Sequence, residues 1–184
     1  MIQQTLKRCE WAETNEVFYS YHDNEWGVVS HDERYLFELL NLEGAQAGLS
    51  WLTVLKKRDH YKQVFNDFDA VKISEYDENK RADLLRDSGI IRNRLKVNAV
   101  IENAKAFLET QQEFGSFDSY IWSFSDGKTF GLQDHSFSLH VSQVMSKTLK
   151  KRGFRFIGPT ICHAYMQAIG MVDDHTPDCF RYRY

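Results

Sequence analysis

The chain has 184 residues, of which 42% are hydrophobic and 27% charged, a balance that excludes a disordered polypeptide and is typical of a single compact domain spanning residues 1–184. No segment reaches the roughly 20 apolar residues of a membrane span, and Met1–Arg8 is not followed by an apolar signal core, so we expect a cytoplasmic protein without membrane contact. A formal net charge of -3 argues against a broad, non-specific nucleic-acid binder, so any contact with DNA must be local.

Helical periodicity predicts an all-α fold. The chain contains only two prolines and ten glycines, and its apolar residues recur three or four positions apart over long segments. The polar segment Ser125–His140, which includes Asp126-Gly127, is predicted to be the longest loop. The predicted helices are Glu33–Leu42, Trp51–Phe65, Lys80–Asp87, Arg94–Glu109, Phe117–Phe124, Val141–Lys151 and Pro159–Ile169.

The segment Leu42–Trp51 places an acidic residue among apolar ones. Glu43 follows Leu39-Leu40-Asn41-Leu42, where a carboxyl group must either lie near the surface or have a partner. On a continuous helix Glu43, Ala47 and Trp51 would lie on one side, although two glycines within the segment make a break plausible. The residues alone allow two interpretations, a binding pocket or a surface Glu43 beside a core Trp51.

Two predicted helices near the C-terminus are joined by a short connection bounded by Gly153 and Gly158. Lysines end the pattern Val141–Lys151, where the negative end of a helix dipole favours cations, and Pro159 fits the first turn of the next helix. Such a turn can present backbone N–H groups and a positive helix end to a DNA phosphate, and Arg155 would add charge. The alternative is an ordinary helical hairpin with a solvated basic end.

Cysteine and histidine residues occur near both ends of the chain. An odd number of cysteines, without a secretory signal, is not typical of a disulfide framework. His175 and Cys179 are four residues apart, so one helical turn would direct both at one point, and Cys9 and His22 could complete a tetrahedral zinc site. Such a closed shell would leave no place for an activated water, so the zinc would be structural. The alternative is a buried and a surface cysteine, with His22 bonded to a carboxylate such as Asp23.

Several long strings resemble the DNA-3-methyladenine glycosylase I family, and the similarity extends nearly from end to end. The strings keep the order and approximate separations of the family. They are Tyr21-His22-Asp23-Asn24-Glu25-Trp26-Gly27, Leu42–Trp51 with Thr53–Arg58, Gly89-Ile90-Ile91-Arg92, and Lys150–Gly158.

The resemblance implies an all-helical member of the helix-hairpin-helix DNA glycosylase superfamily that releases 3-methyladenine from alkylated double-stranded DNA. The target nucleotide would be flipped out and its base removed by hydrolysis, leaving an abasic site without a lyase step. One structural Zn²⁺ is implied, on ligands that fall at Cys9, His22, His175 and Cys179. We expect no organic cofactor and a monomer, since nothing in the chain demands a protein partner.

The resemblance also assigns the pocket. Glu43 and Tyr21 would hydrogen-bond the excised base, Trp51 would stack on it, and Trp26 would line the same pocket. Methylation at N3 makes the attached adenine cationic, and both a carboxylate at Glu43 and the face of Trp51 favour a cation. Glu43 is therefore the candidate catalytic residue, which would recognise the base and stabilise charge while water attacks the sugar.

The remaining candidates concern DNA contact and the sugar. Leu49 is the expected wedge in the gap left by the extruded base, and Gly153, Arg155 and Gly158 are the expected DNA-binding residues. Phe18 replaces a tyrosine common in the family, so no hydroxyl contact is expected there. Asp173 follows the second helix, where many relatives in the superfamily have a sugar-stabilising aspartate, but we interpret it as a helix-end group or a partner of the zinc ligands.

Two other classes of function remain open. A non-catalytic, zinc-containing domain that only senses distorted DNA would bind alkylated or abasic DNA without base release. A zinc hydrolase would need an open coordination position and only three protein ligands, which four matching ligands oppose.

Overall fold

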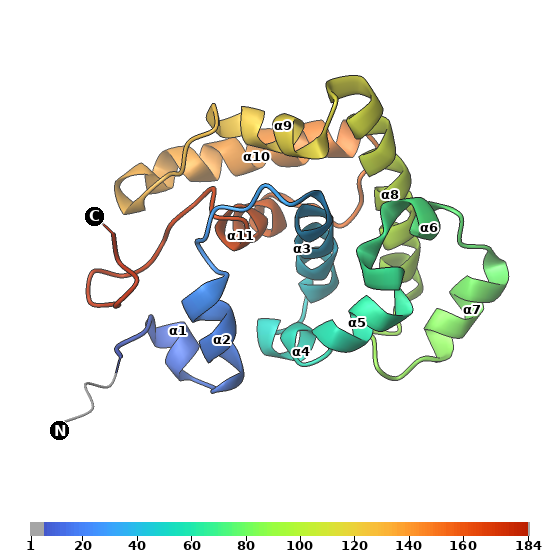
Figure 1. Ribbon diagram of the computed structural model, residues 1–184, viewed down its shortest axis with the longest axis horizontal. Helices are drawn as coiled ribbons and strands as arrows, with labels where there is room; N and C mark the ends of the chain where they lie inside the picture. The colour runs from blue at the N-terminus through green and yellow to red at the C-terminus, as the bar shows by residue number, and fades with distance from the viewer. Residues whose placement is uncertain (1–5, 184) are drawn as a thin grey trace.

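The computed structural model describes residues 6–183, which form helices and connecting segments without a β-strand, in agreement with the predicted all-α fold (Figure 1). Short 3-10 turns occupy Asn66–Phe68, Ser123–Ser125 and Leu132–Asp134. The α-helices are α1 (Glu10–Glu13), α2 (Val17–Asn24), α3 (Glu33–Gln46), α4 (Trp51–Leu55), α5 (Arg58–Val64), α6 (Ala70–Ser74), α7 (Glu78–Arg86), α8 (Arg94–Phe114), α9 (Phe117–Trp122), α10 (His135–Lys151) and α11 (Pro159–Ala168).

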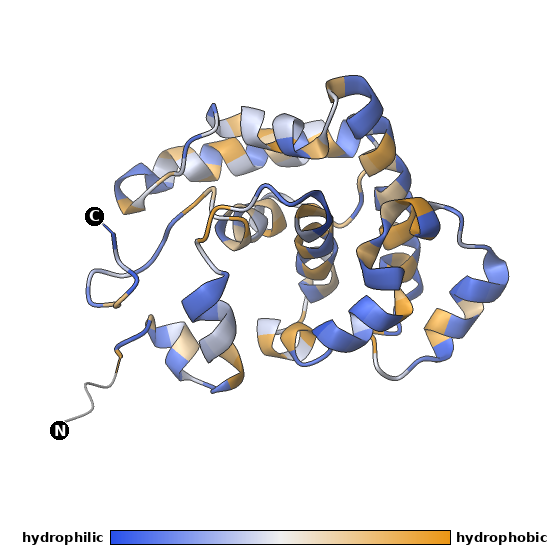
Figure 2. Ribbon diagram, in the orientation of Figure 1, coloured by the Kyte–Doolittle hydropathy of each residue, from blue (hydrophilic) through white to orange (hydrophobic). Residues whose placement is uncertain are grey.

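The helix α3 lies at the centre and packs against α11, α8 and α4, while α10 packs along α11. Figure 2 shows the apolar colouring concentrated on these inner helices. Phe37 and Leu40 of α3 and Tyr165 of α11 are fully buried. Burying side chains of this size stabilises the folded state by roughly 1.5–3 kcal/mol each, so the middle of α3 is a rigid support for the residues near its end.

Side-chain caps explain where the central helices begin. The Asp32 side chain accepts a hydrogen bond from the Tyr35 backbone N–H (2.7 Å) at the start of α3. Ser50 accepts from Thr53 (3.2 Å) at the start of α4, and Asn93 begins α8 in the same way. These caps satisfy backbone donors that have no partner inside the helix.

Several predicted helix boundaries differ from the structure, as in α8, which continues past the predicted end at Glu109 to Phe114. The predicted helix Glu33–Leu42 continues to Gln46, because the break falls after Gly44, at a turn in which Gly48 has φ +74°. The predicted helix Trp51–Phe65 is divided into α4 and α5. At this division Arg58 begins α5 and points into the protein, where it pairs with acidic side chains.

The predicted loop Ser125–His140 is wrong in its last six residues, because α10 begins at His135. Serines made this part of the sequence look polar and irregular. Within the helix Ser138 and Ser142 donate their hydroxyl hydrogens to the carbonyl oxygens of His135 and Leu139, at 2.9 and 2.8 Å. Both serines can therefore be buried in a helix without an unsatisfied hydroxyl.

The connection between α10 and α11 is anchored by a buried pair of asparagines. The side-chain oxygen of Asn103 in α8 accepts a hydrogen bond from the Arg155 backbone N–H (2.7 Å). The side-chain amide of Asn103 donates a hydrogen bond to the side-chain oxygen of Asn41 in α3 (2.9 Å). Gly44 lies directly below this connection, and a Cβ there would be 3.2 Å from the Phe156 carbonyl oxygen. The glycine in α3 therefore lets the connection pack closely against the helix.

Segments from the two ends of the chain lie together. The Phe180 N–H donates to the Lys7 carbonyl (2.8 Å), and Lys7 forms an ion pair with Asp178. The segment Met1–Arg8, which is predicted not to belong to a signal peptide, is described by the structure only from residue 6. Among the described residues, no helix is long and apolar enough to cross a membrane.

Candidate active site and metal centre

A cavity of about 240 Å³ lies between the helices α1, α2, α3, α4 and α11. It brings together all four residues expected to bind the base, although they come from separate segments of the chain. Its lining residues are Trp11, Tyr21, Trp26, Glu43, Gln46, Trp51, Ala164 and Gln167.

Glu43 projects from the last turns of α3 and is 3% exposed. Its Oε2 atom is buried without a hydrogen-bond partner among the described residues, and burial raises the pKa of the carboxyl group to about 8. At neutral pH the group is therefore mainly protonated. This differs from the expected carboxylate, because burial disfavours the charged form of the group. A neutral carboxyl group can both donate and accept a hydrogen bond.

Aromatic rings surround this carboxyl group. The rings of Tyr21 and Trp51 lie 5.2 Å apart at 51°, and those of Trp11 and Trp26 lie 5.0 Å apart at 72°. The indole Nε1 of Trp51 is also buried without a partner among the described residues. Apolar faces and unpaired polar atoms thus meet in one cavity, which suits a flat heteroaromatic ligand that carries donors and acceptors.

Burial also affects the Tyr21 hydroxyl. Its pKa lies well above the ordinary value, mainly through burial and further through the nearby Glu43 carboxyl group. The hydroxyl therefore stays protonated at any physiological pH. Like the carboxyl group, it is available to a ligand as a neutral hydrogen-bonding group.

Lys96 of α8 fixes the turn that joins Glu43 to Trp51. Its ammonium group donates to the carbonyl oxygens of Ala45 (2.8 Å) and Ala47 (2.6 Å), and burial lowers its pKa. These carbonyls belong to the end of α3 and the turn after it, which have no further helical partners. Lys96 thereby holds the approach to α4 and its first residue, Trp51.

A partly buried ion-pair network supports the segment that carries Trp26. Arg58 contacts Glu25 at 2.7 Å and Glu38 at 2.6 Å, and the Tyr35 hydroxyl donates to Glu25 at 3.2 Å. Glu25 directly precedes Trp26, so the network connects α5 and α3 to the segment that supplies this tryptophan. The sequence offered no signal for this pairing, because the partners are 20 and 33 residues apart.

Four lining residues were not predicted, namely Trp11, Gln46, Ala164 and Gln167. Gln46 lies three residues after Glu43 on the same helix, so helical periodicity could have indicated it. Gln167 and Ala164 come from α11, which only the tertiary fold brings to this place. Phe18, where no hydroxyl contact was expected, lies behind the cavity with its ring 5.5 Å from that of Trp11.

Comparisons with known proteins agree with this geometry. The model of the methyladenine glycosylase family matches residues 11–182. The chain belongs to this family. DNA-3-methyladenine glycosylase 1 of Escherichia coli (strain K12) is 44% identical over 182 residues, covering 96% of this chain and 97% of the relative.

Solved structures give the same result. A crystal structure of 3-methyladenine DNA glycosylase I (TAG) has a TM-score of 0.91 and 46% identity, covering 96% of this chain and all of the other. A structure on 3-methyladenine recognition by TAG from Staphylococcus aureus has a TM-score of 0.89 and 33% identity, covering 95% and 96% of the two chains. The protein is therefore a glycosylase.

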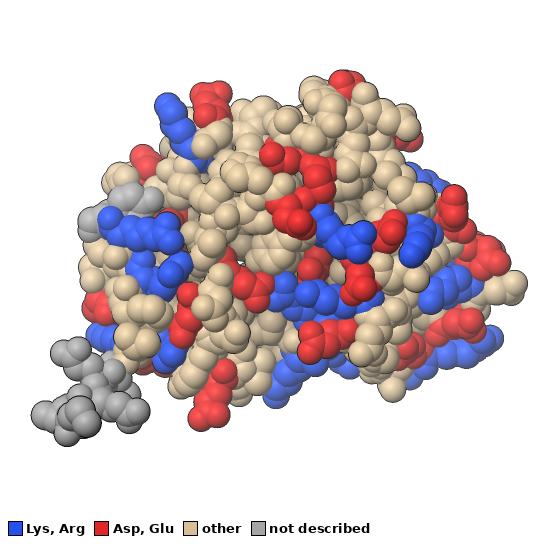
Figure 3. Space-filling model, viewed as in Figure 1, with Lys and Arg blue, Asp and Glu red and all other residues tan. Residues whose placement is uncertain are grey.

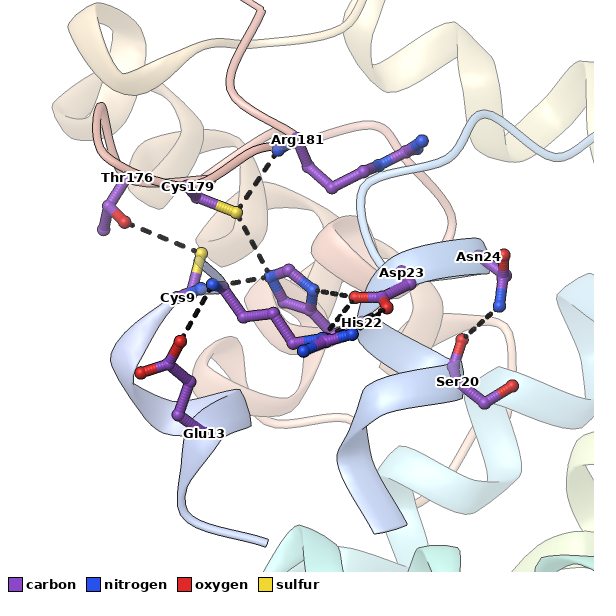
Figure 4. Close-up of polar contacts among 10 residues, drawn as sticks. Cys9, Glu13, Ser20, His22, Asp23, Asn24, Thr176, Cys179 and Arg181 are labelled. Carbon is purple, nitrogen blue, oxygen red and sulfur yellow. Dashed lines mark hydrogen bonds and ion pairs between the residues drawn. The ribbon is translucent and has the colours of Figure 1, made fainter. Parts of the chain in front are cut away.

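In this glycosylase three of the four expected zinc ligands form a buried cluster (Figure 4). The ligand atoms of Cys9, His22 and Cys179 lie within 4.8 Å of one another, and the Cys179 sulfur is 3.5 Å from His22 Nε2. The other ring nitrogen of His22 bonds to Asp23 at 2.8 Å, and Asp23 pairs with Arg8 at 2.7 Å. A carboxylate behind a histidine is the usual support for a metal ligand.

The fourth expected ligand, His175, is adjacent but reaches this place differently from the prediction. Residues 173–176 are not helical, because Pro177 disfavours helical geometry before it, so His175 and Cys179 do not share a helical turn. The His175 ring is 5.1 Å from that of His22, and its Nδ1 contacts Asp173 at 2.6 Å. Its Nε2 is buried without a hydrogen-bond partner among the described residues, as expected of a nitrogen that binds a metal ion.

The residues expected to contact DNA do not line the cavity beside Glu43 (the base cavity), and they reach the surface. Leu49 is 43% exposed at the turn before α4, and Arg155 is exposed on the α10–α11 connection. Gly153 has φ +95°, and a Cβ on Gly158 would meet nothing within 4 Å. On the face seen in Figure 3, basic and acidic side chains are intermixed, which agrees with local rather than broad DNA contact.

Proposed function

We propose that this glycosylase releases 3-methyladenine from alkylated double-stranded DNA by flipping the nucleotide and hydrolysing its glycosidic bond. The observation that carries the proposal is the buried, unpartnered Glu43 carboxyl group between Tyr21 and Trp51 in a cavity of about 240 Å³. Relatives named for 3-methyladenine excision and recognition, similar over nearly the whole chain, support the choice of base.

The nucleotide must leave the helix, since the target bond cannot be reached inside a duplex. Extrusion costs a few kcal/mol, and less where methylation has weakened pairing. The exposed Leu49 would fill the resulting gap, because the α3–α4 turn carries it next to the residues that receive the base. Backbone N–H groups near Gly153 and Gly158, with Arg155, would bind phosphates without reading sequence.

Base recognition would rest on Glu43, Tyr21 and Trp51. The Trp51 face stacks on the base, and the protonated Glu43 carboxyl group donates one hydrogen bond and accepts another. A cationic N3-methylated base beside Glu43 would lower the pKa of the carboxyl group and favour loss of its proton. The same residue would thus bind the charged nucleotide as a carboxylate and the neutral freed base as an acid.

Cleavage of the glycosidic bond does not require an acidic side chain that protonates the base. Methylation at N3 makes the base a good leaving group that departs as a neutral molecule, so no protonation by the enzyme is required. Water would add to the sugar carbon as the glycosidic bond breaks, which leaves an abasic site and no covalent intermediate. The Asp173 carboxylate is hydrogen-bonded to the His175 ring, which supports its assignment to the metal centre and not to the sugar.

A structural Zn²⁺ would fit Cys9, His22, His175 and Cys179, as the buried cluster and the unpaired His175 Nε2 support. Four protein ligands close the coordination shell, so the ion supplies no chemistry to the reaction. The His175 ring lies 4.7 Å from the Trp26 ring, so the centre would fix one side of the base cavity.

The test is incubation of the full chain with methylated DNA, followed by chromatographic identification of the freed base. We expect 3-methyladenine as the main product, and abasic sites in equal amount without strand cleavage. Tight binding to methylated DNA without any freed base would overturn the proposal and indicate a protein that only senses damage. Strand breaks that match the released base would contradict the absence of a lyase step.

A further inference from the structure

A second cluster of metal-ligating side chains lies apart from the cysteine-containing one. His135 is the first residue of α10, His163 lies in α11, and Asp174 follows α11. One ligand atom of each residue lies within 4.8 Å of the others. Three separate segments therefore bring two imidazoles and a carboxylate to one point.

Each member of this cluster is oriented by its surroundings. Gln167 donates to the Oδ2 atom of Asp174 at 2.6 Å, while the Oδ1 atom is buried without a partner among the described residues. His163 contacts the Ser138 hydroxyl at 3.2 Å, and its ring lies edge to face with that of His135 at 5.7 Å. A buried carboxylate oxygen without a donor is costly, which a bound cation would relieve.

We propose that His135, His163 and Asp174 bind a divalent transition-metal ion such as Zn²⁺, Co²⁺ or Ni²⁺. Two imidazole nitrogens and one carboxylate oxygen are a donor set that these ions prefer. Ligand atoms would lie about 2.0–2.2 Å from the ion. The exposed His135 side chain can rotate to bring them together, whereas His163 and Asp174 are partly buried.

The site would border the base cavity. Gln167, which holds Asp174, lines the base cavity, and with Ala164 and His163 it also lines a neighbouring cavity of about 340 Å³ between α10 and α11. The described residues supply three protein ligands, so at least one coordination position is left for water or another oxygen ligand. In this respect the site differs from the closed cysteine-containing centre.

Equilibrium dialysis of the full-length protein against Co²⁺, followed by absorption spectroscopy and elemental analysis, tests the proposal. We expect a cobalt ion that shows d–d absorption but no thiolate-to-metal charge transfer, since the site has no sulfur. His135→Ala and His163→Ala should each weaken this binding at least about tenfold. His140→Ala, which removes another exposed histidine from α10, should leave it unchanged.

Thiolate charge transfer distinguishes the two sites, because only the other cluster contains cysteine. Cobalt bound solely with thiolate charge transfer, or no bound cobalt, would overturn the proposal. Cobalt binding without thiolate charge transfer that is unchanged in both His135→Ala and His163→Ala would also overturn the proposal. Because His135 is exposed, His135→Ala should keep the thermal midpoint of the unchanged protein, so loss of binding in that variant cannot be attributed to unfolding.

Discussion

The Glu43 side chain is a buried acid placed where aromatic faces leave room for a flat molecule. Its Oε2 atom has no partner among the described residues, and the Tyr21 and Trp51 rings stand on the same cavity. An unsatisfied buried polar atom costs about 1–3 kcal/mol, so a ligand that supplies a hydrogen bond to this atom would bind more tightly by up to about that amount. That cost is what the bound base would remove.

Glu43→Gln should reduce release of 3-methyladenine at least about 100-fold, as loss of a key polar group in a pocket does. The amide keeps the shape of the side chain but can neither ionise beside a cation nor donate as an acid. Chromatography of bases freed from methylated DNA measures the effect. Glu109→Gln, an exposed change on α8, is the control, and equal release by both variants would contradict the role of Glu43.

The raised pKa of Glu43 predicts a pH dependence of stability. The folded carboxyl group titrates near 8 and the unfolded one near 4.5, so between these values the folded protein binds more protons. Its contribution to folding stability is therefore lost as pH rises through this window, with a slope of at most about 1.4 kcal/mol per pH unit. Urea unfolding at several pH values should show this fall in the unchanged protein and a smaller one in Glu43→Gln; parallel curves would refute it.

At the level of single residues, the sequence predicted some of the side chains that line the pocket and missed others. Physical reasoning indicated only that Glu43 and Trp51 could share a site, and the family resemblance added Tyr21 and Trp26. Gln167 could not have been found, because its contribution depends on how α11 packs against α3. The raised pKa of Glu43 was also missed, since it depends on how deeply the folded protein buries this side chain.

At the level of elements, the turn between α3 and α4 is stabilised by a side chain from α8. Lys96→Met should leave the Ala45 and Ala47 carbonyls without their donor, at a cost of about 1–3 kcal/mol. Base release should fall about tenfold, because Trp51 follows this turn. Lys105→Met, which removes an exposed lysine from the same helix, should change neither stability nor release, and equal effects of both changes would contradict this role of Lys96.

Gly158 begins α11 in a backbone conformation that any residue can adopt, and its surroundings leave space for a side chain. Leucine is a poorer N-cap than glycine but meets no steric clash here, so Gly158→Leu should lower the thermal midpoint by only a few degrees. If a phosphate approaches this backbone, the same change should weaken DNA affinity about tenfold without altering which base is released. Fluorescence anisotropy with a labelled duplex measures affinity; unchanged affinity, or altered base choice alone, would argue against phosphate contact here.

The type of most elements was predictable, while several boundaries were not. Long amphipathic patterns indicated α8 and α11, whose lengths allow several turns to repeat the apolar spacing. The start of α10 was missed because its serines donate to helix carbonyls, which composition does not show. The short helices α1, α2 and α6 were also missed, because each contains too few turns for periodicity to appear.

At the scale of the whole molecule, the proposed zinc centre would connect segments from near the two ends of the described chain. Elemental analysis of freshly purified protein should find zinc, and Cys9→Ala should lose it and lower the thermal midpoint by at least about 10 °C. Cys162→Ala is the matched control, because Cys162 is buried outside the cluster, where its sulfur contacts the Ile157 carbonyl. Zinc retained in Cys9→Ala, or absent from the unchanged protein, would contradict the assignment.

The pairing of both chain ends also has a consequence for biosynthesis. The Thr176 hydroxyl contacts the Cys9 sulfur across 167 positions, and Phe180 bonds to Lys7. A ribosome releases the N-terminal residues first, so Trp26, whose ring packs against that of His175, must wait for almost the entire chain before this partner exists. The base cavity is therefore among the last parts of the nascent protein to form. A chain whose translation stops before Cys179 would lack a complete cavity and would expose aromatic side chains to chaperones.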